Sequence, residues 1–246
     1  MTIRVGVGGW TYEPWRGVFY PEGLAHKREL EYAARQLTAI EINATYYGRQ
    51  KPQSWAKWAE AVPEGFVFSI KASRYSTARK VLADGGQSVK VFIEQGFAAL
   101  GEKLGPINWQ FAEGKTFERD DFARFLDFIP DAQDGVRLRH AIEVRHESFA
   151  DPAFLELARA RNMAVVYADH DSFPRIEGQT ADFTYARLQG TVDEIETGYD
   201  AAALDAWAKQ AKVWAQAGRD VYVYFISGAK VRNPAAAQAL IARLGA

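Results

Sequence analysis

The segment His140-Ala-Ile-Glu-Val-Arg-His146 decides how this sequence is interpreted. Apolar Ile142 and Val144 alternate with Glu143 and Arg145, and successive side chains of a strand point to opposite faces of a sheet. The apolar pair can therefore pack beneath a helix, while the charged pair points toward whatever the sheet encloses. Buried charges are costly unless they pair or bind a ligand. The segment thus predicts a buried strand that carries an interior ionic site.

Two earlier runs repeat this alternation. In Ala39-Ile-Glu-Ile-Asn43 and Phe66-Val-Phe-Ser-Ile-Lys71, the polar residues Glu41, Asn43 and Lys71 take the parity opposite to the large apolar ones. Three strands are therefore predicted to end in inward-pointing polar groups.

Strand-like runs recur along the whole chain and alternate with amphipathic helical stretches. The strands are expected at Ile3 to Gly8, Ala39 to Asn43, Phe66 to Lys71, Ile107 to Phe111, Ala141 to Arg145, Ala164 to Asp169, Phe183 to Leu188 and Val221 to Phe225. The helices are expected at Arg28 to Leu37, Ser54 to Ala61, Val89 to Leu104, Arg119 to Phe128, Pro152 to Arg161, Ala201 to Ala217 and Pro234 to Leu244. Such alternation implies a parallel sheet, and eight units in 246 residues favour an α/β fold, a (β/α)8 TIM-type barrel, over an open doubly wound sheet.

The segment Asp169-His-Asp-Ser-Phe-Pro-Arg175 has the composition of a loop, so the sixth βα unit is predicted to be degraded.

No linker, repeat or low-complexity tract divides the sequence, and one domain over residues 1–246 is expected. The balance of 30 basic and 31 acidic residues gives no argument for a nucleic acid or a membrane surface. The chain has no cysteine, and it lacks a long apolar span or signal-like start, which suggests a cytoplasmic protein.

Enzymes with this fold carry their sites at the carboxyl ends of the strands. The inward positions there are expected to form a polar ring of Glu41, Asn43, Lys71, Asn108, Gln110, Glu143, Arg145, Asp169, Tyr185 and Arg187, with Tyr222 and Tyr224 of uncertain parity. Glu41, Glu143 and Lys71 are the candidates for acid–base catalysis, because buried ionisable groups have shifted pKa values. Arg145, Arg187 and Lys71 predict an anionic ligand, a phosphate or a carboxylate. The alternative is that these charges form ion pairs that only fill the barrel.

Other kinds of site have weaker support. Of the four histidines, only His146 and His170 lie near the mouth, and no metal-ligand spacing is present, so no metal and no other cofactor is predicted. There is no Gly-x-Ser-x-Gly elbow, and the first glycines do not complete a dinucleotide fingerprint. The aromatic loop after the first strand, with Trp10 and Tyr12, and Tyr46 of the next loop could either pack over the rim or stack on a ligand.

Several motifs together resemble the YecE-like family, domain of unknown function 72. They are Gly8-Gly-Trp-Thr-Tyr12 with Trp15 and Phe19-Tyr-Pro21, Glu41-Ile-Asn-Ala-Thr-Tyr-Tyr47, Phe66-Val-Phe-Ser-Ile-Lys71, Leu104-Gly-Pro106 with Gln110, Glu143-Val-Arg-His146 and Tyr185-Ala-Arg-Leu188. The resemblance runs nearly end to end and implies a TIM-type barrel without an established activity. The chain departs from the family pattern at Ser76-Thr-Ala-Arg79, Ala112-Glu113, Arg187-Leu-Gln-Gly190 and Phe225-Ile-Ser-Gly228, notably at Ala78, Gln189 and Ile226-Ser227.

Three functional hypotheses follow. The first is a metal-independent enzyme, whether isomerase, lyase or hydrolase, that uses Glu41 or Glu143 for proton transfer. In it, Lys71, Arg145 and Arg187 hold a small anionic ligand, and Asn43, Gln110, His146 and Asp169 complete the binding site. The second is a nucleic-acid-binding protein with a barrel of endonuclease IV-like shape. The third is a non-catalytic anion sensor, and the oligomeric state is left open by the sequence.

Overall fold

Nine parallel strand segments form a closed barrel in the computed structural model, which describes residues 1–245. The strands are β1 (Ile3–Gly8), β2 (Ala39–Ile42), β3 (Val67–Lys71), β4 (Leu104–Gln110), β7 (His140–Glu143), β8 (Ala164–Val165), β9 (Tyr167–Asp169), β10 (Phe183–Leu188) and β11 (Asp220–Phe225). Their order is β8-β7-β4-β3-β2-β1-β11-β10-β9. A short antiparallel pair, β5 (Ala132–Gln133) and β6 (Val136–Arg137), lies apart from this sheet.

The barrel closes through the run 164–169. Its first half, β8, pairs with β7, and its second half, β9, pairs with β10. Val166 joins the two halves, and its N–H donates to the carbonyl of Ile142. Strands β8 and β9 are therefore one interrupted strand, and the predicted (β/α)8 barrel is confirmed.

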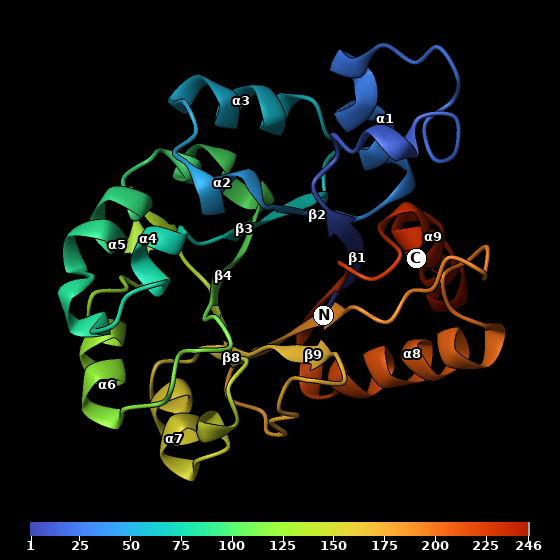
Figure 1. The fold of residues 1–246 in the computed structure, drawn as a ribbon. Helices are drawn as coiled ribbons and strands as arrows, with labels where there is room; N and C mark the ends of the chain where they lie inside the picture. Colours follow the sequence, from blue (N-terminus) through green and yellow to red (C-terminus); the bar gives the residue numbers. More distant parts are fainter. Residues whose placement is uncertain (246) are drawn as a thin grey trace.

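Helices surround the outside of this ring (Figure 1). The helices of residues 1–245 are α1 (Glu29–Gln36), α2 (Ala44–Tyr47), α3 (Pro52–Glu60), α4 (Arg74–Thr77), α5 (Gly86–Ile93), α6 (Arg119–Asp127), α7 (Pro152–Ala160), α8 (Ala201–Trp214) and α9 (Asn233–Leu244). The short α2 lies at the mouth of the barrel and not in the outer layer. The helix predicted over 89–104 is wrong in its second half. It ends at Ile93, because Gly96 has a left-handed φ of 98°, and a 3-10 segment (Phe97–Lys103) follows.

No helix follows β9 in residues 170–182, which confirms the predicted loss of the sixth helix. The outer faces of β9 and β10 are instead covered in part by α8. None of the helices in residues 1–245 is long and apolar enough to cross a membrane.

The buried residues separate into two layers. The larger one packs the outer faces of the strands against the helices. The smaller one fills the barrel interior with Ala39, Val67, Ala141, Ala164, Val166, Phe183, Tyr185, Tyr222, Tyr224 and Ile226. Tyr222 and Tyr224 therefore point inward, which settles their parity. Because these apolar and aromatic groups fill the lower barrel, the charged residues gather above them at the carboxyl ends.

Candidate functional site

Arg187 joins two carboxylates inside the barrel. Its Nη2 donates to Oε1 of Glu41 at 3.1 Å, and its Nη1 donates to Oε2 of Glu143 at 2.7 Å. Both glutamates are fully buried, and Arg187 is 2% exposed. The three residues come from β2, β7 and β10, so the ion pairs link distant parts of the chain across the barrel.

Glu143 has further partners on both oxygens. Arg145 donates to Oε1 from Nη2 at 2.9 Å and from Nε at 3.2 Å. The amides of Gln110 and Asn108 donate to Oε2 at 2.9 Å and 3.1 Å. Burial alone would raise the pKa of Glu143, but Arg187, Arg145 and these amides outweigh it and lower the pKa from 4.5 to about 2. A carboxylate held in this way is a weak proton acceptor at neutral pH.

Both carboxylate oxygens of Glu41 also accept hydrogen bonds. The hydroxyl of Tyr185 donates to its Oε2 at 2.6 Å, and Nη2 of Arg187 donates to its Oε1. Burial, followed by the charge of Glu41, raises the pKa of Tyr185 well above its ordinary value, so the phenol keeps its proton and stays a donor. One layer below, the hydroxyl of Tyr224 donates to Oγ of Ser69 at 2.7 Å. The carboxylates thus lie above a layer of packed, hydrogen-bonded side chains.

Lys71, the last residue of β3, differs from its charged neighbours. Within residues 1–245 its ammonium group makes no ion pair, and it lies 4.2 Å from the centre of the Tyr46 ring. Burial and then the charge of Arg187 lower the pKa of Lys71 from 10.5 to about 8, against the opposing charges of Glu41 and Glu143. Lys71 is therefore the group of this site whose proton affinity lies near neutral pH.

A cavity of about 830 Å³ opens above the network. It is lined by Gly8, Gly9, Trp10, Thr11, Tyr12, Ile42, Asn43, Ala44, Tyr46, Tyr47, Trp58, Lys71, Gln110, Arg145, Arg187, Ile226, Ser227, Lys230 and Asn233. Four of these side chains are basic, namely Lys71, Arg145, Arg187 and Lys230, and none is acidic. The buried Nε of Arg187 finds no acceptor within the part of the chain that the structure describes. The charged side chains that line the cavity are therefore all basic.

Aromatic rings form the rim of this cavity. Trp10 packs edge-on against Trp58, with ring centres 5.1 Å apart. Tyr12 lies under the ammonium group of Lys230, which is 4.0 Å from the ring centre. Trp10, Tyr12 and Tyr46 are each partly exposed, so their faces are available to a ligand as well as to their neighbours.

The comparisons with known proteins agree with this fold. The family described as "Protein of unknown function DUF72" matches residues 4–246. The chain belongs to DUF72. A DUF72 protein from Enterococcus faecalis is 19% identical with a TM-score of 0.77, over 100% of this chain and 96% of the other. One from Thermotoga maritima is 23% identical with a TM-score of 0.74, over 98% and 97%.

A D-psicose 3-epimerase from Clostridium cellulolyticum, whose structure contains D-tagatose, is 11% identical with a TM-score of 0.56, over 100% of this chain and 97% of the other. At such low identity the likeness shows the fold alone. No curated protein matches the sequence.

Asn43 of this DUF72 protein lines the cavity at the end of β2. Its Nδ2 donates to the carbonyl of Glu41 at 3.4 Å. Gly8 of β1 makes room for it, because a Cβ at Gly8 would lie only 2.7 Å from that nitrogen. A glycine is thus needed at position 8, because a larger side chain there would clash with Asn43.

His146 and Asp169 lie outside the lining of this cavity. His146 caps a 3-10 segment (Glu147–Phe149), where its Nδ1 accepts from the N–H of Ser148 at 3.1 Å. Asp169 does not point inward, as the sequence suggested. Ala164 and Val166 of the same run belong to the barrel interior, so strand alternation turns Asp169 outward.

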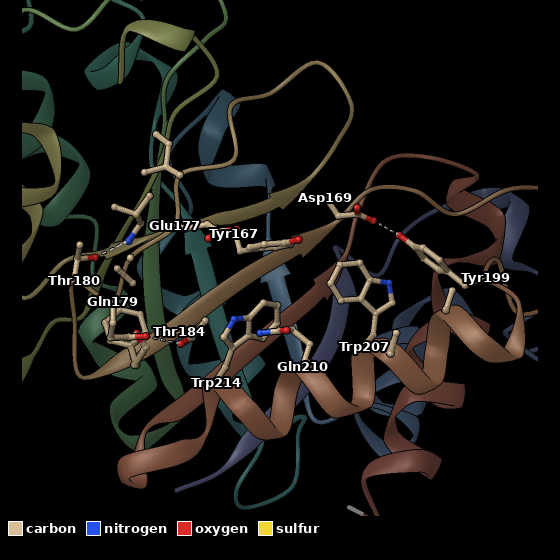
Figure 2. Close-up of a pocket in the computed structure, with 17 residues that line it drawn as sticks. Tyr167, Asp169, Glu177, Gln179, Thr180, Thr184, Tyr199, Trp207, Gln210 and Trp214 are labelled. Atoms are coloured by element: carbon tan, nitrogen blue, oxygen red, sulfur yellow. Dashed lines mark hydrogen bonds between the residues drawn. The ribbon is translucent and has the colours of Figure 1, made fainter. Parts of the chain in front are cut away.

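Asp169 instead lines a second cavity of about 700 Å³ between β9, β10 and α8. Figure 2 shows its carboxylate beside the hydroxyl of Tyr199, which donates to it at 2.9 Å. Trp207 and Trp214 project from α8 toward Tyr167 in the space that a sixth helix would occupy. The expectation for Asp169 was wrong because burial alternates regularly from Ala164 to Asp169, and this alternation gives Asp169 the outward parity.

Two departures from the family pattern fall near the site. Ile226 and Ser227 line the cavity, and Ser227 has a left-handed φ of 64°. Gln189 is buried, and its Nε2 finds no partner among residues 1–245. Ala78 only ends helix α4.

Lys230, Trp58 and Asn233 were not predicted as site residues. Lys230 follows the eighth strand, so the rule that sites lie in the loops after barrel strands would have found it. Trp58 comes from a helix, where no sequence signal separates it from core aromatics. No group of three or more His, Asp or Glu side chains that could hold a metal ion occurs in residues 1–245.

Proposed function

We propose that this protein is an enzyme that acts on a small anionic molecule at the carboxyl-terminal mouth of the barrel, with Lys71 as its acid–base group. The observation that carries this proposal is the lining of the cavity, which has four basic side chains and no acidic one. Two buried carboxylates face three nearby cations, Arg187, Arg145 and Lys71, so one positive charge is in excess before Lys230 is counted. A bound anion would neutralise that excess.

The catalytic roles differ from those that the sequence suggested. Glu41 and Glu143 do not line the cavity, and Glu143 is too weak a base to accept a proton near neutral pH. We assign both glutamates to holding Arg187 and Arg145 in place. Lys71 reaches the cavity and has the pKa, about 8, that suits proton transfer there. Gln110 and Asn43 supply uncharged hydrogen-bonding groups that would orient the ligand.

The test is stabilisation by anions. An anion that binds only the folded protein should add about 2.7 kcal/mol at ~100 times its dissociation constant. Inorganic phosphate and citrate should therefore raise the melting temperature beyond the effect of sodium chloride at equal ionic strength. Lys230→Met should weaken this effect, while Lys90→Met, on an exposed helix surface, should leave it unchanged. The same stabilisation by sodium chloride as by phosphate would contradict the proposal.

Nucleic-acid binding is a second candidate, favoured by one surface feature. Tyr47 and Tyr75 are 66% and 58% exposed beside the mouth, and the guanidinium of Arg74 lies 5.8 Å and 5.4 Å from their ring centres. Exposed aromatic rings with a cation can stack on bases and contact phosphates. Binding of single-stranded DNA that weakens steeply with salt and is lost in Arg74→Ala would support this candidate.

A further inference from the structure

Every carboxylate oxygen near Lys71 is already bonded to another donor. Glu41 uses Oε1 for Arg187 and Oε2 for Tyr185. Glu143 uses Oε1 for Arg145, and its Oε2 accepts from Arg187 as well as from two amides. The network thus satisfies its own charges without Lys71. The lysine is left as a surplus cation at the edge of the cavity.

The surroundings of Lys71 favour its neutral amine. Lys71 is largely buried, and the other charged side chains that line the same cavity, Arg145, Arg187 and Lys230, are all cations. A lysine that is desolvated and adjacent to cationic groups is the usual form of a nucleophilic lysine. The face of Tyr46 holds the nitrogen at the cavity wall without accepting its proton.

We infer that Lys71 is a nucleophile that forms an iminium with the carbonyl carbon of a small aldehyde or ketone bearing a phosphate or carboxylate group. This inference rests on the proposed function and adds the substrate class to it. The anionic group would pair with Arg145 or Lys230, which line the same cavity. The amide of Gln110, fixed by its bond to Glu143, would donate to the carbonyl oxygen.

The covalent step needs no further reactant. The lone pair of the neutral Lys71 amine adds to the carbonyl carbon, and the carbonyl electron pair moves to oxygen, which takes a proton. The nitrogen loses one proton, and the hydroxyl takes one from solvent and leaves as water. One amine, one carbonyl and one proton thus give one iminium and one water, with no change in oxidation state. Solvent in the open cavity supplies and accepts these protons.

Reductive trapping tests this inference. The full-length protein is incubated near neutral pH with sodium cyanoborohydride and either pyruvate or dihydroxyacetone phosphate, with acetone as the uncharged control. Reduction of an iminium gives a stable secondary amine, which is detected by intact mass and located by peptide mapping. Near neutral pH the neutral fraction of Lys71 should exceed that of an ordinary lysine by roughly two orders of magnitude. Lys71 should therefore be labelled at least about tenfold faster than the exposed Lys90.

The variants fix the interpretation. Lys71→Arg keeps the charge but cannot form the adduct, so it should lose the single fast label, while Lys90→Arg should keep it. Arg145→Met should slow labelling by the two anionic carbonyls more than labelling by acetone, because it removes an anion partner as well as a cation that lowers the pKa of Lys71. Melting curves of each variant, recorded first, confirm that it is folded.

Four outcomes are decisive. Fast, selective labelling of Lys71 by an anionic carbonyl supports the inference. Labelling that is absent, or spread evenly over exposed lysines, overturns it. Stabilisation of the untreated protein by inorganic phosphate is measured separately, so a positive phosphate effect without a Lys71 adduct removes the covalent step and leaves the proposed function standing. No phosphate effect removes the proposed function itself.

Discussion

Replacing Arg187 with methionine should destabilise the protein strongly, because two buried carboxylates would lose their shared partner. The magnitude follows from Glu143. Its pKa falls from 4.5 to about 2 in the folded protein, and two to three units correspond to about 3 kcal/mol of stability at neutral pH. Removal of one partner of a buried pair is expected to cost ~3–5 kcal/mol. Arg187→Met should therefore lower the free energy of unfolding by about that amount near pH 7.

The pH dependence of this loss identifies its cause. In the parent, the folded pKa of Glu143 lies below the unfolded one, so its contribution is present above about pH 4.5 and is lost as pH falls toward 2. Without Arg187, burial should raise the pKa of Glu143 above its ordinary value. The penalty should then grow as pH rises above about 4.5, and the difference between variant and parent should shrink as pH falls toward 2, where Glu143 is protonated in both proteins.

Urea unfolding of both proteins near neutral pH and near about pH 4 measures this difference. Arg137→Met is the matched control, because the pair Arg137–Asp182 lies on the surface, with side chains 67% and 47% exposed. It should cost under about 1 kcal/mol at either pH. A loss below about 1 kcal/mol for Arg187→Met, or the same loss at both pH values, would refute the assignment of Arg187 as the charge partner of the buried glutamates.

Three further predictions concern single groups of the molecule. Lys71→Met should raise the free energy of unfolding near neutral pH by about 2 kcal/mol, because a lysine whose folded pKa of about 8 lies below 10.5 is destabilising at every pH below that range; equal or lower stability in urea would contradict this. Arg145→Met should cost only about 1–2 kcal/mol, because Glu143 keeps Arg187, and it should abolish stabilisation by phosphate; a thermal shift with and without phosphate tests both parts. His140 should titrate near pH 4 by NMR, since burial lowers its pKa from 6.5 to about 4, and its contribution to stability should be lost as pH falls through that interval; titration near 6.5 would show that the side chain is solvated.

The fold could be predicted well from the sequence because its signal is local. Alternating runs such as Ala39–Ile42 and Phe183–Leu188 show the strand period directly, and their charged inward residues stand out against the apolar outward ones. The failures were also local. The helix expected over 89–104 stops at Ile93, because the left-handed backbone of Gly96 overrides the apolar periodicity.

The site could be predicted only in part. The alternation of a strand shows which face a side chain is on, but it does not show whether that side chain reaches the cavity. Alternation correctly turns Glu41, Glu143 and Arg187 inward, yet it cannot show that Arg187 covers both carboxylates and that they fail to reach the cavity. Asp169 was assigned to the wrong face, because the interior positions of its strand hold small or apolar residues such as Ala164 and Val166 and give no polar signal. Lys230 was missed although it lies in the loop after the last strand, where the rule for barrel sites would have found it; only its position over the Tyr12 ring depends on tertiary packing.

The two glutamates lie below the cavity surface, and this position connects the ionic network with the proposed chemistry of Lys71. A lysine beside a free carboxylate would form an ion pair and keep its proton, with a raised pKa. Here the carboxylate oxygens already accept hydrogen bonds from Arg187, Arg145 and Tyr185. Lys71 therefore lies near other cations without forming an ion pair of its own. Removing a competing donor should therefore change the lysine. Tyr185→Phe leaves Oε2 of Glu41 with only the long 3.5 Å bond from Nδ2 of Asn108. We therefore expect the pKa of Lys71 to rise, with slower reductive labelling and a higher pH midpoint for that labelling. An unchanged pH midpoint in Tyr185→Phe would mean that burial alone, and not the saturation of the carboxylates, sets the reactivity of Lys71.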